Sequence, residues 1–207
     1  MDNKIRLVDY IADRIHQLGV KHVYTLTGGG AMFLNDSVKK HEKLLSVCNH
    51  HEQASAMAAV AHAKYTNGFS VVIPTTGCGS TNCVTGLLDA WQDNLPCIFI
   101  SGQVNKDQTE DIAYHLDKAF HLASTGRRGP VWIDVPLDVQ GAFIDPSELK
   151  RYIPDDKTLS PDLNNLREML ERATRPVILA GNGVRLAGAS KEIKTVAEKH
   201  KIPVVTT

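Results

Sequence analysis

The strongest constraint on the fold is a stretch in which two apolar strands each run into a polar or glycine-rich turn and then a helix. Residues 47–86 read VCNHHEQASAMAAVAHAKYTNGFSVVIPTTGCGSTNCVTG. The pattern predicts a strand over 44–48, a helix entered at His51-Glu52-Gln53, a strand over 69–74, and a Gly77-Cys78-Gly79-Ser80 loop that opens another helix. Parallel strands end at a common sheet edge, so Glu52 and the 77–82 loop are expected together at the edge where open α/β sheets bind ligands.

The rest of the first 140 residues repeats this alternation. Further helices are expected over 5–18, 33–41 and 111–124, and further strands over 21–25, 96–101 and 131–135. The strand over 21–25 runs into three adjacent glycines at 28–30, which permit a sharp turn and a close approach. Strands that alternate with helices predict an α/β fold, a doubly wound parallel sheet, over residues 1–140.

The composition changes after residue 140. Residues 141–161 contain prolines and many charges without a period, which is typical of a linker. A helix over 163–173, a strand over 175–181, a helix over 189–200 and the start of another strand follow. A single βαβ unit cannot bury both faces of its sheet, so residues 162–207 are expected to be an incomplete second, Rossmann-like domain.

The overall composition excludes several classes of protein. The 207 residues carry 23 basic and 23 acidic side chains, which gives no reason to expect nucleic acid or an anionic membrane as a partner. No apolar run approaches the length of a membrane span, and the N-terminus lacks the apolar core of a signal peptide. Four cysteines without a C-x-x-C pair predict reduced thiols in a cytoplasmic protein.

Glu52 allows two interpretations. A carboxylate in the first turn of a helix is favoured by the helix dipole, by roughly 0.3–1 kcal/mol when exposed. Alternatively, a carboxyl group held in an apolar cleft can share a proton with a bound molecule. The glycine loops at 28–30 and 77–79, expected at the same sheet edge, favour the second interpretation.

The other candidate sites are weak. Gly77-Cys78-Gly79-Ser80 could bind a phosphate, and the Gly181-Asn182-Gly183 turn a dinucleotide, but neither completes a full signature. The nearby histidines match no zinc spacing, so they are interpreted as ordinary helix residues and no metal site is predicted in this chain. These histidines are His50, His51 and His62.

A set of motifs resembles the N-terminal domain of thiamine-diphosphate-dependent enzymes, most closely the acetolactate synthase (acetohydroxyacid synthase) large subunits. The motifs are Gly19-Val20-x-x-Val23-Tyr24, Gly28-Gly29, His51-Glu52-Gln53-Ala54, Gly77-x-Gly79-Ser80-Thr81-Asn82, Ser101-Gly102-Gln103-Val104 and Gly129-Pro130-Val131-x-Ile133-Asp134-Val135-Pro136-x-Asp138-Val139-Gln140. Arg175-Pro176 through Gly183 resembles the start of the middle domain. The motifs follow the family's order and span nearly the whole chain.

The resemblance implies a pyrimidine-binding domain in which Glu52 is the catalytic residue. In the family this glutamate hydrogen-bonds the aminopyrimidine ring of thiamine diphosphate. By the same resemblance Leu26, Gly28, Thr75 and Asn82 bind the cofactor. The implied reaction decarboxylates pyruvate and transfers the two-carbon unit to a second 2-keto acid, in branched-chain amino acid biosynthesis. The resemblance also implies a homodimer or homotetramer, Mg²⁺ bound through a domain absent from this chain, and in many members FAD.

The chain also departs from the family pattern. A family segment is expected between Gln108 and Asp111 but is missing at 109–110, and no third domain with the metal motif is present. Thr27 and Cys78 stand where the family commonly has proline, which leaves the substrate open. The alternatives are another 2-keto acid decarboxylase or a keto-sugar acetyl carboligase on the same frame and, in a different class, a non-catalytic fragment or binding module.

Overall fold

The computed structural model describes residues 4–103, 111–155 and 161–207. The chain divides into two compact units, Met1–Pro154 and Asp155–Thr207. Each unit is described by itself below. Among the described residues, no helix combines the length and the apolar character needed to cross a lipid bilayer.

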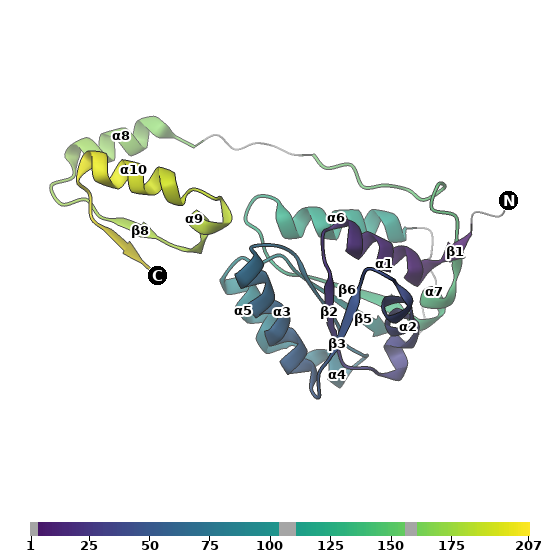
Figure 1. The fold of residues 1–207 in the computed structure, drawn as a ribbon. Helices are drawn as coiled ribbons and strands as arrows, with labels where there is room; N and C mark the ends of the chain where they lie inside the picture. Colours follow the sequence, from purple (N-terminus) through teal and green to yellow (C-terminus); the bar gives the residue numbers. More distant parts are fainter. Residues whose placement is uncertain (1–3, 104–110, 156–160) are drawn as a thin grey trace. The chain divides into compact units, whose positions relative to one another are not determined.

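A five-stranded parallel sheet forms the centre of the first unit (Figure 1). Its strands are β2 (His22–Thr25), β3 (Leu45–Cys48), β4 (Ser70–Ile73), β5 (Cys97–Gln103) and β6 (Val131–Pro136). They lie in the order β3-β2-β4-β5-β6. All four residues of β4 are buried, because this strand is central and covered on both faces. The predicted α/β class with a parallel sheet is confirmed.

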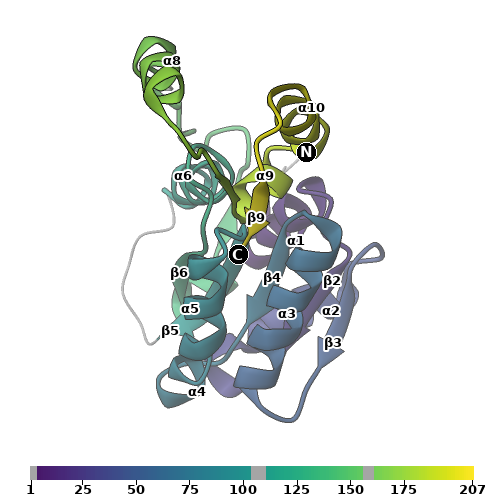
Figure 2. The ribbon, with the colours of Figure 1, turned by 90° about the vertical axis from the view of Figure 1, so that its left-hand side faces the viewer.

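Helices cover both faces of this sheet (Figures 1 and 2). On one face lie α1 (Leu7–Gln17), α2 (Met32–Lys40) and α6 (Ile112–Ser124), packed on Val71, Ile73, Ile98 and Ile100. On the other face lie α3 (Glu52–Thr66) and α5 (Val84–Gln92), packed on Val72 and Phe99. A Cβ atom at Gly86 would lie 2.6 Å from Cβ of Ala56, so small residues let α3 and α5 approach closely. The sheet is therefore doubly wound, as expected.

Local boundaries differ from the expectations in two places. The helix expected over 5–18 is preceded by a strand, β1 (Ile5–Arg6), which pairs antiparallel with β7 (Phe143–Ile144) after the short helix α7 (Leu137–Gly141). The first part of the expected linker thus packs on the first unit, with Ile144 buried. The loop expected at Gly77-Cys78-Gly79-Ser80 contains a short helix of its own, α4 (Cys78–Thr81), before the expected helix begins as α5. The helical period in a sequence cannot predict a strand partner that is distant in the chain, and it cannot predict a helix of a single turn.

One connection in the sheet has an unusual hand. The chain steps from β2 to β3 through α2, then in the opposite direction through α3, α5 and α6 to β4, β5 and β6. The crossover through α2 runs in one direction along the sheet and covers one face, whereas those through α3 and α5 run in the opposite direction and cover the other face. Because direction and face both change, the three crossovers have the same hand. The β5–α6–β6 crossover runs in the direction of α5 but on the opposite face, so its hand is opposite. Nearly all such crossovers in proteins are right-handed, and one exception within a sheet is therefore notable.

The second unit contains α8 (Leu163–Arg172), β8 (Ile178–Ala180), α9 (Asn182–Leu186), α10 (Ser190–His200) and β9 (Val204–Thr206). Strands β8 and β9 pair in parallel. None of the described residues 161–207 is buried, and apolar side chains such as Leu163, Leu179 and Val205 are exposed. A lone βαβ unit leaves this much apolar surface open because it has no second layer of helices.

Candidate active site

The order of the strands creates a topological switch point between β2 and β4, where sheets of this kind are expected to form a crevice. The chain leaves β2 for β3 on one side and later returns to β4 on the other, so the connections from β2 and from β4 run in opposite directions along the sheet. Ligands of doubly wound sheets bind at such a switch point, beyond the carboxyl ends of the strands. Leu26, half-buried, and Gly28 follow β2, and Thr75, also half-buried, follows β4. Three of the five predicted site residues therefore border this crevice.

Glu52 reaches the crevice as the first residue of α3, which follows β3. His51 caps this helix, its Nδ1 accepting a hydrogen bond from the Gln53 N–H at 3.1 Å. The Glu52 side chain is buried, with 7% of the residue exposed. Its Oε2 accepts a hydrogen bond from Nδ2 of Asn82 at 3.0 Å. The structure thus brings together the predicted catalytic glutamate and the predicted asparagine, which ends α4.

Two glycines make the contacts around Glu52 possible. A Cβ atom at Gly79 would lie 2.9 Å from Oε1 of Glu52 and 2.5 Å from Cγ2 of Thr75. A Cβ atom at Gly28 would lie 2.5 Å from Cβ of Thr75. The Ser80 hydroxyl donates to the carbonyl of Thr75, which fixes the loop after β4. One close-packed wall is therefore formed by the backbone at Gly28 and Gly79, the Thr75 side chain and the Glu52 carboxyl group. Larger side chains at the two glycines would disrupt it.

Cys83, which the sequence analysis did not single out, contacts the backbone of Glu52. Its Sγ contacts the backbone carbonyl of Glu52 at 3.5 Å. Burial, with a smaller contribution from the Glu52 charge, raises the pKa of this thiol to about 12. Cys83 therefore stays neutral and packs against the backbone of Glu52 instead of acting as a nucleophile. Its position one residue after Asn82 is the only sequence signal that could have found it.

The surroundings of Glu52 limit what its carboxyl group can bind. Among the described residues, Glu52 accepts a side-chain hydrogen bond from the amide of Asn82 at Oε2 and forms no ion pair with a cation. In the part of the chain that the structure describes, no three His, Cys, Asp or Glu side chains gather as metal ligands. His51 is a helix cap, and Nδ1 of His62 lies 3.0 Å from the hydroxyl of Tyr24. Among the described residues, Glu52 is thus the buried carboxyl group at this switch point and the candidate for acid–base chemistry there.

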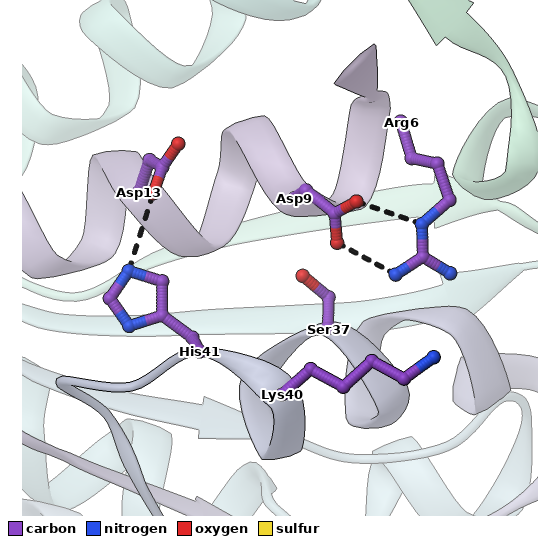
Figure 3. Close-up of a pocket in the computed structure, with 6 residues that line it drawn as sticks. All are labelled: Arg6, Asp9, Asp13, Ser37, Lys40 and His41. Carbon is purple, nitrogen blue, oxygen red and sulfur yellow. Dashed lines mark hydrogen bonds and ion pairs between the residues drawn. The ribbon is translucent and has the colours of Figure 1, made fainter.

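A second polar cluster lies between α1 and α2 (Figure 3). It borders a cavity of about 250 Å³ lined by Arg6, Asp9, Asp13, Ser37, Lys40 and His41. Arg6 pairs with Asp9 at 2.8 Å, and Lys40 pairs with Asp36 at 2.9 Å. His41 lies 3.3 Å from Asp13. Because these charges compensate one another, the cluster joins two helices and is not a second candidate for catalysis.

Comparison with protein families identifies the chain. Residues 5–124 match the thiamine pyrophosphate enzyme N-terminal TPP binding domain, and residues 163–207 match the thiamine pyrophosphate enzyme central domain. The chain belongs to the thiamine pyrophosphate enzymes. The resemblance stated from the motifs is therefore confirmed, and the crevice at Glu52 lies in the family's cofactor-binding domain.

Individual relatives agree with this family. The chain is 32% identical over 234 residues to an acetolactate synthase of Arthrospira platensis, an alignment that covers 95% of this chain and 40% of the relative. The acetolactate synthase large subunit of Lactococcus lactis gives 32% identity with the same coverage. The chain thus spans about 40% of the length of these thiamine pyrophosphate enzymes. A thiamine diphosphate-dependent 4-hydroxybenzoylformate decarboxylase from Rhodococcus jostii RHA1 shares the fold, with a TM-score of 0.84, 22% identity, and coverage of 98% of this chain and 44% of that one.

Proposed function

We propose that this chain supplies the pyrimidine-binding half of the active site of an acetolactate synthase. That enzyme would decarboxylate pyruvate and transfer the two-carbon unit to a second 2-keto acid, a reaction of branched-chain amino acid biosynthesis. The observation that carries the proposal is the buried Glu52 carboxyl, held by Asn82 at the switch point of the sheet. Support for this particular reaction comes from the 32% identity to acetolactate synthases over 95% of the chain.

The residues of the crevice fit the aminopyrimidine ring. Gly28 and Gly79 both pack against the Thr75 side chain, so these three residues would offer one compact surface to the flat ring. Glu52 would hold and move one proton at a ring nitrogen, with Asn82 fixing the orientation of its carboxyl group. Leu26 would contribute apolar surface from the end of β2. Thiamine diphosphate, when bound, supplies an acidic carbon that adds to the 2-keto acid and stabilises the negative charge left by loss of CO₂.

The remaining parts of the site would come from outside this chain. We propose that Mg²⁺ and the diphosphate are held by a further part of the enzyme, since the chain spans about 40% of its relatives. The complete site would then form in a homodimer or homotetramer. A structural FAD on the middle domain belongs to the same proposal and would approach the Gly181–Gly183 turn at the start of α9.

The unusual β5–β6 crossover supports a segment missing from this chain near residues 109–110. The alignment to the Arthrospira relative, 234 residues long, exceeds the 207 residues of the chain, so the relative has residues without a counterpart here. A strand inserted in sequence between β5 and α6, and placed beyond β6 in the sheet, would reverse the direction of the step through α6 and give that crossover the common hand. We propose that the relatives carry such a segment at this point.

Product analysis tests the proposal. The complete enzyme, with its intact mass verified, is incubated with pyruvate, thiamine diphosphate and Mg²⁺, and CO₂, acetolactate and acetaldehyde are measured. Acetolactate formation that disappears in Glu52→Gln is the expected result. Acetaldehyde without acetolactate would instead identify a decarboxylase. An intact mass of 22.7 kDa with no cofactor binding would identify a non-catalytic module.

A further inference from the structure

A loop after β2 crosses the end of β4 and reaches β5. It contains the short 3₁₀ helix η1 (Gly29–Ala31) and carries Gly28, which borders Thr75. A Cβ atom at Gly30 would lie 2.9 Å from Oγ1 of Thr76, and one at Gly102 of β5 would collide with the carbonyl oxygen of Gly30. The loop therefore lies against two strands, and its position sets the distance between Gly28 and Thr75.

The near end of this loop is fixed at β2. The Thr25 hydroxyl lies 2.8 Å from Oδ1 of Asn35 on α2 and 2.7 Å from the carbonyl oxygen of Ile73 on β4. These contacts tie the last residue of β2 to its neighbouring strand. The far end, at Gly30, needs a separate anchor because β4 lies between β2 and β5.

Gln140 provides that anchor. Its side chain is completely buried, and Nε2 donates to the carbonyl of Gly30 and to the carbonyl of Val135, both at 2.8 Å. Val135 is the register partner of Gly102, whose backbone lies against Gly30. A single amide group from α7 thus joins the end of β6 to a loop 110 residues earlier in the chain.

Both amide hydrogens of Gln140 are used, so no other residue type replaces it easily. A glutamate would have no proton to donate when ionised, and an asparagine is one carbon shorter. An apolar side chain would donate to neither the Gly30 nor the Val135 carbonyl oxygen. The contacts then lead from Gln140 through Gly30 and Gly28 to Thr75 and Gly79, beside the carboxyl of Glu52.

From this geometry we infer that Gln140 is a positioning residue of the cofactor site. It would hold the Gly28–Gly30 loop in the position that binding of the aminopyrimidine ring requires, without touching the ring. This inference rests on the proposed function. It makes one specific claim: loss of the two amide donors should loosen the loop, and the loosened loop should weaken cofactor binding.

The test compares Gln140→Met with Ser37→Ala in the complete enzyme. Methionine keeps the length of the side chain and removes both donors, and avoids the buried charge of Gln140→Glu. Ser37 is the matched control, because its buried hydroxyl also donates to a backbone carbonyl, that of Val8 at 3.0 Å, between α1 and α2. Hydrogen exchange of a peptide covering residues 26–33 reports the loop, and titration with thiamine diphosphate and Mg²⁺ reports affinity.

We expect Gln140→Met to speed exchange in this peptide and to raise the dissociation constant of the cofactor by about tenfold or more, and Ser37→Ala to do neither. Exchange and affinity equal to those of Ser37→Ala would overturn the inference. If the unmodified enzyme bound no cofactor, the proposed function would fail. The exchange result would still decide separately whether Gln140 holds the loop.

Discussion

Nδ2 of Asn82 lies 3.0 Å from Oε2 of Glu52, although the two residues are 30 positions apart and follow different strands. The contact forms because β3 and β4 both end at the same edge of a parallel sheet, with β2 between them. An acidic side chain with a single amide donor in a mostly buried position is well suited to exchange a proton with a ligand.

Replacing Glu52 by glutamine should remove proton exchange while preserving the fold. Glutamine has the same shape and can still accept a hydrogen bond from Asn82, but it cannot take up or release a proton. In the complete enzyme, exchange of the C2 proton of bound thiamine diphosphate should slow by about 10²–10⁴-fold. The exposed Glu42 provides a control, since Glu42→Gln should leave this rate unchanged. A normal rate in Glu52→Gln would remove Glu52 from its role.

Adjacent glycines give a matched pair for the wall of the site. An added Cβ at Gly28 would lie 2.5 Å from Cβ of Thr75, whereas one at Gly29 would meet nothing within 4 Å. Gly28→Ala should therefore cost about 1–3 kcal/mol in the free energy of unfolding and weaken cofactor binding. Gly29→Ala should change that free energy by less than about 0.5 kcal/mol. Urea unfolding and cofactor titration measure both effects, and equal behaviour of the two variants would contradict the close packing at Thr75.

His62 should make stability fall as the solution becomes acidic. Burial, and then the neighbouring His22, lower the pKa of His62 from its usual 6.5. At a pH above 6.5 the residue is neutral in both the folded and the unfolded chain, so it adds no pH dependence there. As the pH falls through 6.5 and toward the lower folded value, the unfolded chain takes up the proton first, and folding becomes less favourable.

Melting temperatures at pH 7.5 and pH 5.5 check this expectation. The decrease between the two values should be smaller in His62→Gln than in the unmodified protein. His50→Gln is the control, because His50 is exposed. A decrease of the same size in His62→Gln and the unmodified protein would show that His62 does not contribute.

The four cysteines should divide into two reactive and two unreactive thiols. Cys48 and Cys78 are exposed, whereas Cys83 and Cys97 are buried. Burial raises the pKa of Cys97 to about 11 and that of Cys83 to about 12, so neither forms the reactive thiolate near pH 8. Iodoacetamide at that pH should modify Cys48 and Cys78 in the folded protein, and all four thiols in denaturant. Peptide mass analysis identifies the modified sites. Early labelling of Cys83 would mean that this thiol beside Glu52 is accessible to solvent.

The sequence by itself determined the alternation of strands and helices and the residues that gather at one edge. Apolar runs followed by polar turns identified the strands that end near Glu52, Thr75 and Gly28, and parallel strands share their carboxyl edge whatever their order. Motif resemblance then assigned the family, which the comparisons confirmed. These features could be predicted because each depends on neighbouring residues or on a local pattern.

The tertiary structure alone decided which strands are neighbours and what lies beneath and beside the site. The pairing of β1 with β7, the contact of Cys83 with Glu52, and the hydrogen bond from Gln140 to Gly30 join distant parts of the chain. The opposite hand of the β5–β6 crossover likewise depends on which face α6 covers. Periodicity shows that a face is buried but not against which partner, because many partners satisfy the same apolar pattern. Only packing the whole chain selects one of them.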